Sequence, residues 1–204
     1  MNIDAFYPYV LPHVLGCPNP VAVHHIRQAA IEFCNKTRWH EEECSASNAG
    51  GGNVFVEADT DLEVVSISTV YVDGREYRSK SRQSGLALIG AGSLEQFYCV
   101  VRTGEGEVEL AVNPAPDKSV PVRAVATLRP TMAANTISNE LSEWMDGIAS
   151  GAAHRIAAIP AQAFSNPAIS VYHRDLFNEA VKTAKVKKYM GSSETSAPRR
   201  ADVF

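Results

Sequence analysis

The first long stretch of helical periodicity lies between residues 20 and 38. Its stripe repeats at steps of three and four residues, and polar side chains fill most other positions. The stripe consists of Val23, Ile26, Ala30, Phe33 and Thr37. Asn19 is suited to cap the first turn, and Pro20 fits the first helical position. Because such a helix is stable only when its apolar face packs on another element, the pattern predicts a helical bundle.

Two later segments carry matching stripes. The first begins at a cap formed by Thr136 or Ser138 and ends at Pro160, and the second covers 167–190. The stripe of the first consists of Leu141, Met145, Ile148, Ala152, Ile156 and Ile159, and that of the second of Ile169, Tyr172, Leu176, Ala180 and Ala184. The sequence therefore predicts three long helices that pack together although they are far apart along the chain.

Three residues of these helices are candidates for contact between copies of the chain. Gly147 and Gly151 lie one turn apart and leave a shallow groove where another backbone can come close. Each glycine costs about 1 kcal/mol of helix propensity, so a packing role is expected. Ile31 projects from the polar side of the first helix, which fits a helix packed on two sides, although a single exposed isoleucine is also common.

The middle of the chain has the composition of antiparallel strands. Val, Ile, Thr and Tyr are frequent there, and Asp73-Gly74 supplies a tight hairpin turn. Strands are predicted at 53–58, 62–72, 75–80, 96–102, 107–112 and 122–128. Residues 44–53 have the composition of a loop, and 81–93 are predicted to be irregular. Five or six strands of this kind can close into a small sandwich or barrel.

The predicted fold class is α+β, with three parts. A bundle of three long helices, preceded by a short helical turn near the N-terminus, is formed by 1–43 and 136–190. An antiparallel β sandwich or barrel-like domain over 53–129 is inserted into it. Residues 191–204 are small, polar and proline-containing, which predicts an extended C-terminal tail.

Charge is distributed unevenly along the 204 residues, whose net charge is −4. Residues 41–66 hold seven acidic residues and no lysine or arginine, hence −7. Residues 167–204 hold seven basic and four acidic residues, hence +3. A molecule with an acidic region and a basic end can associate with copies or partners of opposite sign; two solvated surfaces are the alternative.

Nothing in the sequence predicts secretion or a membrane span. The N-terminus lacks the charged region and apolar core of a signal peptide, and no apolar run is long enough to cross a bilayer. The four cysteines, Cys17, Cys34, Cys44 and Cys99, are widely spaced. We expect them to be reduced thiols in a protein made in the cytoplasm.

No motif predicts catalysis, a metal or a cofactor. His24 and His25 are adjacent on a helix and point about 100° apart, so they do not share a metal easily. The run 39–44 contains His, Glu and Cys, but no second half of a metal site is visible, and a solvated acidic surface is expected. The glycine-rich segment 90–93 lacks the lysine and the following helix of a phosphate loop.

Two stretches at opposite ends of the chain resemble the head-to-tail adaptor, or connector, proteins of tailed bacteriophages. They are VLPHVLGCPNPVAVHHIRQAAIEFCNKTRWHEE at 10–43 and GIASGAAHRIAAIPAQAFSNPAISVYHRDLF at 147–177, about a third of the chain. The matching details include Leu11-Pro12, Cys17-Pro18, Pro20, the run 26–34, the run 149–152, Ile159-Pro160, Asn166-Pro167 and His173-Arg174. These motifs are structural and carry no chemistry.

The resemblance implies a structural protein of the virion neck, made in the cytoplasm of the bacterial host. Such adaptors form a homo-oligomeric ring, commonly of twelve copies, below the portal; the ring extends the DNA channel and receives the tail or nozzle, without specific DNA binding. The C-terminal segment commonly reaches the portal. The residues expected to contact the portal or a neighbouring copy are Lys187, Lys188, Tyr189, Arg199, Arg200, Val203 and Phe204.

Two other functions stay open. A monomeric binding module, or a small enzyme carried on a helical scaffold, would also fit the predicted arrangement of helices and strands. The basic cluster at the C-terminus could bind nucleic acid, but its only interleaved aromatic residue is Tyr189 and the whole chain is acidic. DNA binding would show as strongly salt-dependent association with duplex.

Overall fold

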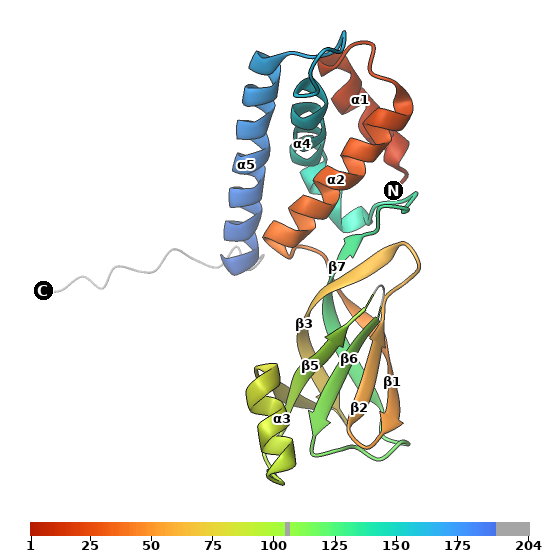
Figure 1. The fold of residues 1–204 in the computed structure, drawn as a ribbon, viewed down its shortest axis with the longest axis vertical. Coiled ribbons are helices and arrows are strands. Elements are labelled where there is room, and N and C mark those ends of the chain that lie inside the picture. The colour runs from red at the N-terminus through yellow and green to blue at the C-terminus, as the bar shows by residue number, and fades with distance from the viewer. Residues whose placement is uncertain (105–106, 191–204) are drawn as a thin grey trace, which may run out of the picture.

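The computed structural model describes residues 1–104 and 107–190 as a layer of helices stacked on a β-barrel (Figure 1). Each part has its own hydrophobic core. The helices are η1 (Ile3–Phe6), α1 (Tyr7–Val10), η2 (Leu11–His13), α2 (Asn19–Thr37), α3 (Arg82–Gly90), η3 (Asn139–Trp144), α4 (Met145–Ala157) and α5 (Pro167–Met190). The strands are β1 (Glu41–Gly50), β2 (Asn53–Glu57), β3 (Leu62–Val72), β4 (Arg75–Ser79), β5 (Phe97–Thr103), β6 (Glu107–Asn113) and β7 (Val122–Pro130).

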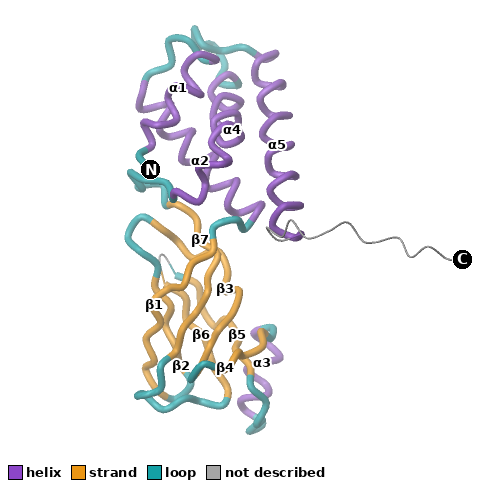
Figure 2. The backbone as a smooth tube through the Cα atoms, turned by 180° about the vertical axis from the view of Figure 1, so that it is seen from behind, coloured by secondary structure: helices purple, strands orange, loops and turns teal. Residues whose placement is uncertain are grey.

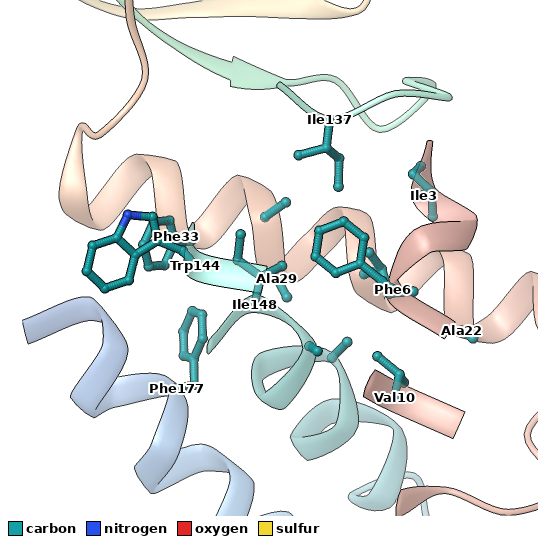
Figure 3. Packing of buried hydrophobic residues seen from close by; sticks show 14 of the residues in the cluster. Ile3, Phe6, Val10, Ala22, Ala29, Phe33, Ile137, Trp144, Ile148 and Phe177 are labelled. Atoms are coloured by element: carbon teal, nitrogen blue, oxygen red, sulfur yellow. The ribbon is translucent and has the colours of Figure 1, made fainter. Parts of the chain in front are cut away.

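The helical core lies between α2, α4 and α5, with α1 closing one end (Figure 3). The buried residues of α2 recur at helical spacing and are Ala22, Ile26, Ala29, Ala30, Phe33, Cys34 and Thr37. Phe6 and Val10 reach the same core from the N-terminal turns. Because the buried faces belong to segments from both ends of the chain, this core forms only when the two ends meet.

Gly147 and Gly151 allow α4 to approach other helices of the same chain. A Cβ at Gly147 would collide with the side chain of Ala180 on α5. A Cβ at Gly151 would lie 2.7 Å from the ring of Phe177 and 3.1 Å from the Cβ of Ala29. The close backbone approach that these glycines permit is therefore made inside the subunit, where they pack α4 against α5 and α2.

The seven strands close into a barrel with the order β1-β2-β6-β5-β4-β3-β7 (Figure 2). Closure comes from β1, which pairs with β2 on one side and with β7 on the other. All pairs are antiparallel except β4 with β5, where Arg78 lies opposite Phe97. The interior is filled by alternating side chains of the strands, chiefly valines, with Tyr98 and Leu110. Closure reduces the exposed strand edges through which sheets can associate, although β4 and β5 pair over a short register, Arg78 with Phe97 and Ser79 with Tyr98.

The predicted fold class, a bundle of three long helices with an inserted sandwich or barrel-like domain, is wrong. The described residues form five α-helices and a closed seven-stranded barrel. The helix expected from 136 or 138 to 159 is a 3₁₀ segment followed by the short α4, because Trp144 takes non-helical backbone angles between them. The loop expected at 44–53 belongs largely to β1, and the irregular segment at 81–93 contains α3.

The residue preferences of these two segments predict neither the strand β1 nor the helix α3. Residues 44–50 are small or polar, but Cys44 pairs with β7 and the residues after it pair with β2, and only Cys44 of that stretch is buried. In α3, Ser81 caps the first turn, and Gly85 lets the helix lie directly on Cys99 of β5. In both places long-range pairing and packing override local composition. None of the helices within 1–104 and 107–190 could cross a membrane.

Three histidines lie where η2, α4 and α5 meet. The buried ring of His173 lies 4.3 Å from the ring of His13, centroid to centroid, and its Nδ1 has no hydrogen-bond partner among the described residues. The Nδ1 of His154 lies 3.1 Å from the carbonyl oxygen of Ser170. Burial lowers the pKa of His173, and the neighbouring His13 and His154 lower it further. The fold therefore favours a neutral His173.

We expect the free energy of unfolding to fall as the pH drops below about 6.5, the pKa of an unperturbed histidine. With a lowered pKa in the fold, the unfolded chain binds the proton of His173 more readily, so stability is complete above that pH and declines toward the lower folded pKa. Urea unfolding at about pH 7.5 and about pH 5.5 should show a smaller difference for His173→Gln than for the unmodified chain. The exposed His24→Gln is the control, and an unchanged pH dependence in His173→Gln would contradict the assignment.

Candidate partner-binding surface

The last two turns of α5 carry the described part of the predicted contact surface. The buried face of the helix comprises Ser170, His173, Phe177, Val181 and Ala184. The end of the opposite face exposes large apolar side chains: Val186, Tyr189 and Met190. Tyr189 is 94% exposed. Soluble monomers expose single apolar residues often, but several at one helix end indicate a contact surface.

Lys187 is held within the subunit. Its Nζ forms an ion pair with Glu143 of η3 and lies 5.6 Å from the ring centroid of Trp39 and 5.8 Å from that of Trp144. The two indole rings pack against each other with centroids 5.0 Å apart. Lys187 therefore fastens the end of α5 to the base of the helical layer, and this cation is already engaged.

Lys188 connects the helical layer to the barrel. Its Nζ lies 3.0 Å from Oε1 of Glu41, the first residue of β1. Ser68 and Thr127 donate hydrogen bonds to the same carboxylate oxygen, at 2.7 and 3.4 Å. Burial acts to raise the pKa of Glu41, but these hydrogen bonds and the charge of Lys188 outweigh it and lower the pKa. Glu41 is therefore a stable anion that joins α5 to β1, β3 and β7.

A groove of about 820 Å³ runs along the ends of α2 and α5. We call it the basic groove; its lining residues are Thr37, Arg38, Lys185, Val186, Lys188, Tyr189 and Met190. Its floor is mostly apolar, and its cations are Arg38, Lys185 and Lys188. Arg38 has a left-handed backbone (φ 53°) that ends α2 and turns the chain toward β1. Of the three cations, only Lys188 forms an ion pair with another described residue.

The remaining predicted contact residues and the histidine pair at 24–25 lie apart from the basic groove. Ile31 is half-buried and lines a separate hollow of about 300 Å³ with Arg129 and Met132. His25 lies 3.1 Å from Gln28 through Nδ1, and burial lowers the pKa of its ring. Outside the described residues lie the predicted contacts of the tail: Arg199, Arg200, Val203 and Phe204.

A second surface includes part of the acidic surface expected at 39–44. A hollow of about 440 Å³ lies beside the junction of the helices and the barrel. We call it the acidic hollow; its lining residues are His40, Glu42, Asp59, Thr60, Asp61, Leu62, Thr136 and Ser138. They come from the start of β1, the β2–β3 connection and the segment before η3. The sequence shows the run 39–44, but the partners of that run lie about twenty and about one hundred residues further along the chain, beyond any local pattern.

Comparison with known proteins does not assign this surface: neither the protein-family models nor the curated proteins contain a match to the chain. Within 1–104 and 107–190, no three His, Cys, Asp or Glu side chains form a group that could hold a metal ion. The surface chemistry described above is therefore the basis for assigning a function.

Proposed function

We propose that this protein is a structural head-to-tail adaptor of a tailed bacteriophage. Copies of the chain associate into a ring in the virion neck, which joins the portal to the tail and extends the DNA channel. The proposal combines the sequence resemblance of 10–43 and 147–177 to such adaptors with the surfaces of the molecule. The chain contributes contacts between proteins and no turnover.

The observation that carries the proposal is the basic groove. It combines an exposed aromatic side chain, Tyr189, with Val186, Met190 and Arg38 on a surface outside the hydrophobic core. Aromatic residues, methionine and arginine are enriched where proteins bind one another. The groove lies at the end of α5, and the residues that follow this helix in the sequence, 191–204, include the other predicted contacts.

The test is assembly of the full chain with the portal protein of the same virus. Size exclusion with light scattering should show a discrete complex of fixed stoichiometry, in which the adaptor forms a ring on the portal. Tyr189→Ala should weaken assembly by at least about tenfold, because a central aromatic anchor supplies much of the energy of an interface.

Deletion of 192–204 should leave the subunit folded and abolish its attachment to the portal.

Tyr172→Ala is the matched control, since Tyr172 is also an exposed tyrosine of α5 but lies four to five turns from Tyr189. It should assemble like the unmodified chain. A chain that stays monomeric beside the portal would contradict the adaptor function. If that monomer binds a small ligand, the binding module or enzyme considered above becomes the better assignment.

A further inference from the structure

Among the described residues, no lysine or arginine pairs with the carboxylates of the acidic hollow. Asp61 accepts a hydrogen bond from the hydroxyl of Thr136, and Glu42 lies 3.5 Å from Nε2 of His40. Glu140, at the rim, lies 3.9 Å from the same nitrogen. Within 1–104 and 107–190, none of these groups, nor Asp59, forms an ion pair with lysine or arginine. Folding therefore gathers negative charge here that no lysine or arginine of the described segments neutralises.

His40 is a second sign that this hollow is a site. The side chain lines the hollow although the residue is only 2% exposed, and its Nδ1 has no hydrogen-bond partner in the described structure. Buried polar atoms are normally paired, so the buried ring, whose Nε2 lies beside Glu42 and Glu140, keeps hydrogen-bonding capacity that the described residues do not use. Because no three ligating side chains of the described segments are close enough for a metal ion, the chemistry favours a larger cation, a guanidinium or an ammonium group.

The complementary cations lie on the other side of the same junction. Arg38 and Lys185 are exposed in the basic groove, and neither forms an ion pair among the described residues. The ends of α2 and α5 lie on one side of the junction, and the β2–β3 connection lies on the other (Figures 1 and 2). Successive side chains of a strand point in opposite directions. At the start of β1, Glu41 therefore contacts Lys188 on the side of the basic groove, and Glu42 lines the acidic hollow on the other side.

We propose that the acidic hollow of one copy receives Arg38 and Lys185 from the basic groove of the next copy. This inference rests on the proposed ring and names the surfaces that form it. The two oppositely charged surfaces lie on opposite sides of the junction between the helices and the barrel. Each copy can therefore contact one neighbour through its basic groove and the other neighbour through its acidic hollow. Such a head-to-tail contact closes into a ring when the rotation between copies divides a full turn. The charges fix the orientation of each copy relative to the next. The apolar floor of the groove supplies apolar surface that is buried in the contact.

Charge reversal of each surface tests the pairing. The acid-side variant is Glu42→Lys with Asp59→Lys, and the base-side variant is Arg38→Glu with Lys185→Glu. Each should lower the association constant of ring assembly on the portal at least about tenfold, since like charges then meet. The chain carrying all four changes should recover assembly, because the signs are again opposite. An equimolar mixture of the two variants should recover assembly for the same reason, in rings of alternating copies.

Matched controls separate this pairing from net charge and from misfolding. Glu76→Lys with Glu107→Lys makes the same change in net charge as the acid-side variant, at exposed barrel positions outside both surfaces, and should assemble normally. Circular dichroism and thermal melting establish that each variant is folded. The association of the unmodified chain should weaken as salt rises, because exposed charges are screened.

Each outcome decides between the two proposals. If the unmodified chain assembles with the portal but all charge variants assemble equally well, the pairing is wrong and the adaptor function stands. If each single-sided variant fails and the four-fold variant does not recover, the two surfaces do not meet. If the unmodified chain does not assemble, both the function and the pairing are overturned. Calorimetric binding of Ca²⁺ that Asp59→Asn abolishes would reassign the hollow as a cation site and overturn the pairing.

Discussion

Phe177→Ala is expected to lower the free energy of unfolding by about 3–5 kcal/mol, the usual cost of truncating a buried phenylalanine. The residue is 3% exposed and fills the seam between α2, α4 and α5. Its ring lies against Gly151, and the cations of Lys36 and Arg155 lie 5.6 and 5.8 Å from its centroid. Because helices around a glycine seam are already in close contact, they have little room to collapse into the cavity.

Urea unfolding followed by circular dichroism measures this loss. Tyr172→Ala is the control on the same helix, because Tyr172 is exposed and its truncation should change stability by less than about 0.5 kcal/mol. A loss below about 1 kcal/mol for Phe177→Ala would mean that α5 does not depend on this seam. The helical layer would then have to be held by another contact.

Glu32→Ala is expected to cost about 1–3 kcal/mol, less than a fully buried pair because both side chains retain some contact with water. Glu32 on α2 pairs with Arg155 on α4 and lies 2.5 Å from Nζ of Lys36. The Arg155 side chain is 21% exposed and donates a second hydrogen bond to the carbonyl of Gly151 at 2.9 Å. Burial lowers its pKa, yet a guanidinium stays protonated, so loss of the carboxylate leaves a partly buried charge unpaired.

A double-mutant cycle isolates this pair. Glu32→Ala with Arg155→Ala should cost less than the sum of the two single changes, because the second removes the charge that the first left unpaired. Lys36→Ala, at the exposed end of the same cluster, should change stability by no more than about 0.5 kcal/mol. Strict additivity of the two single changes would show that the pair contributes nothing to the packing of α2 on α4.

Sequence patterns predicted well the elements whose secondary structure is determined by their own residues. The helix expected at 20–38 is α2, and the strand expected at 62–72 is β3, because each carries a sustained period of apolar residues. The elements that were missed, β1 and α3, depend on what lies beside them: two paired strands for one, and Cys99 below Gly85 for the other. Barrel closure therefore could not be read from the sequence.

The candidate surfaces show the same division. The basic and acidic regions were visible as runs of charge, and the exposed Tyr189 was among the predicted contacts. The ion pairs of two predicted contact residues could not be predicted. Lys187 pairs with Glu143 and Lys188 pairs with Glu41, so both lysines hold the subunit together. The acidic hollow as a whole was missed because folding brings three segments together there that are far apart in the sequence. Spacing along the chain does not indicate such a contact.

Closure of the barrel by its own first and last strands places the two connections to the helices at one rim. Glu41 lies opposite Thr127, so the polypeptide leaves the helical layer and returns to it through neighbouring strands. Modules whose termini are adjacent tolerate insertion and exchange without disturbing their host. An exchange of the barrel for another module with adjacent termini therefore needs two neighbouring connections and a replacement for the contact of Lys188 with Glu41.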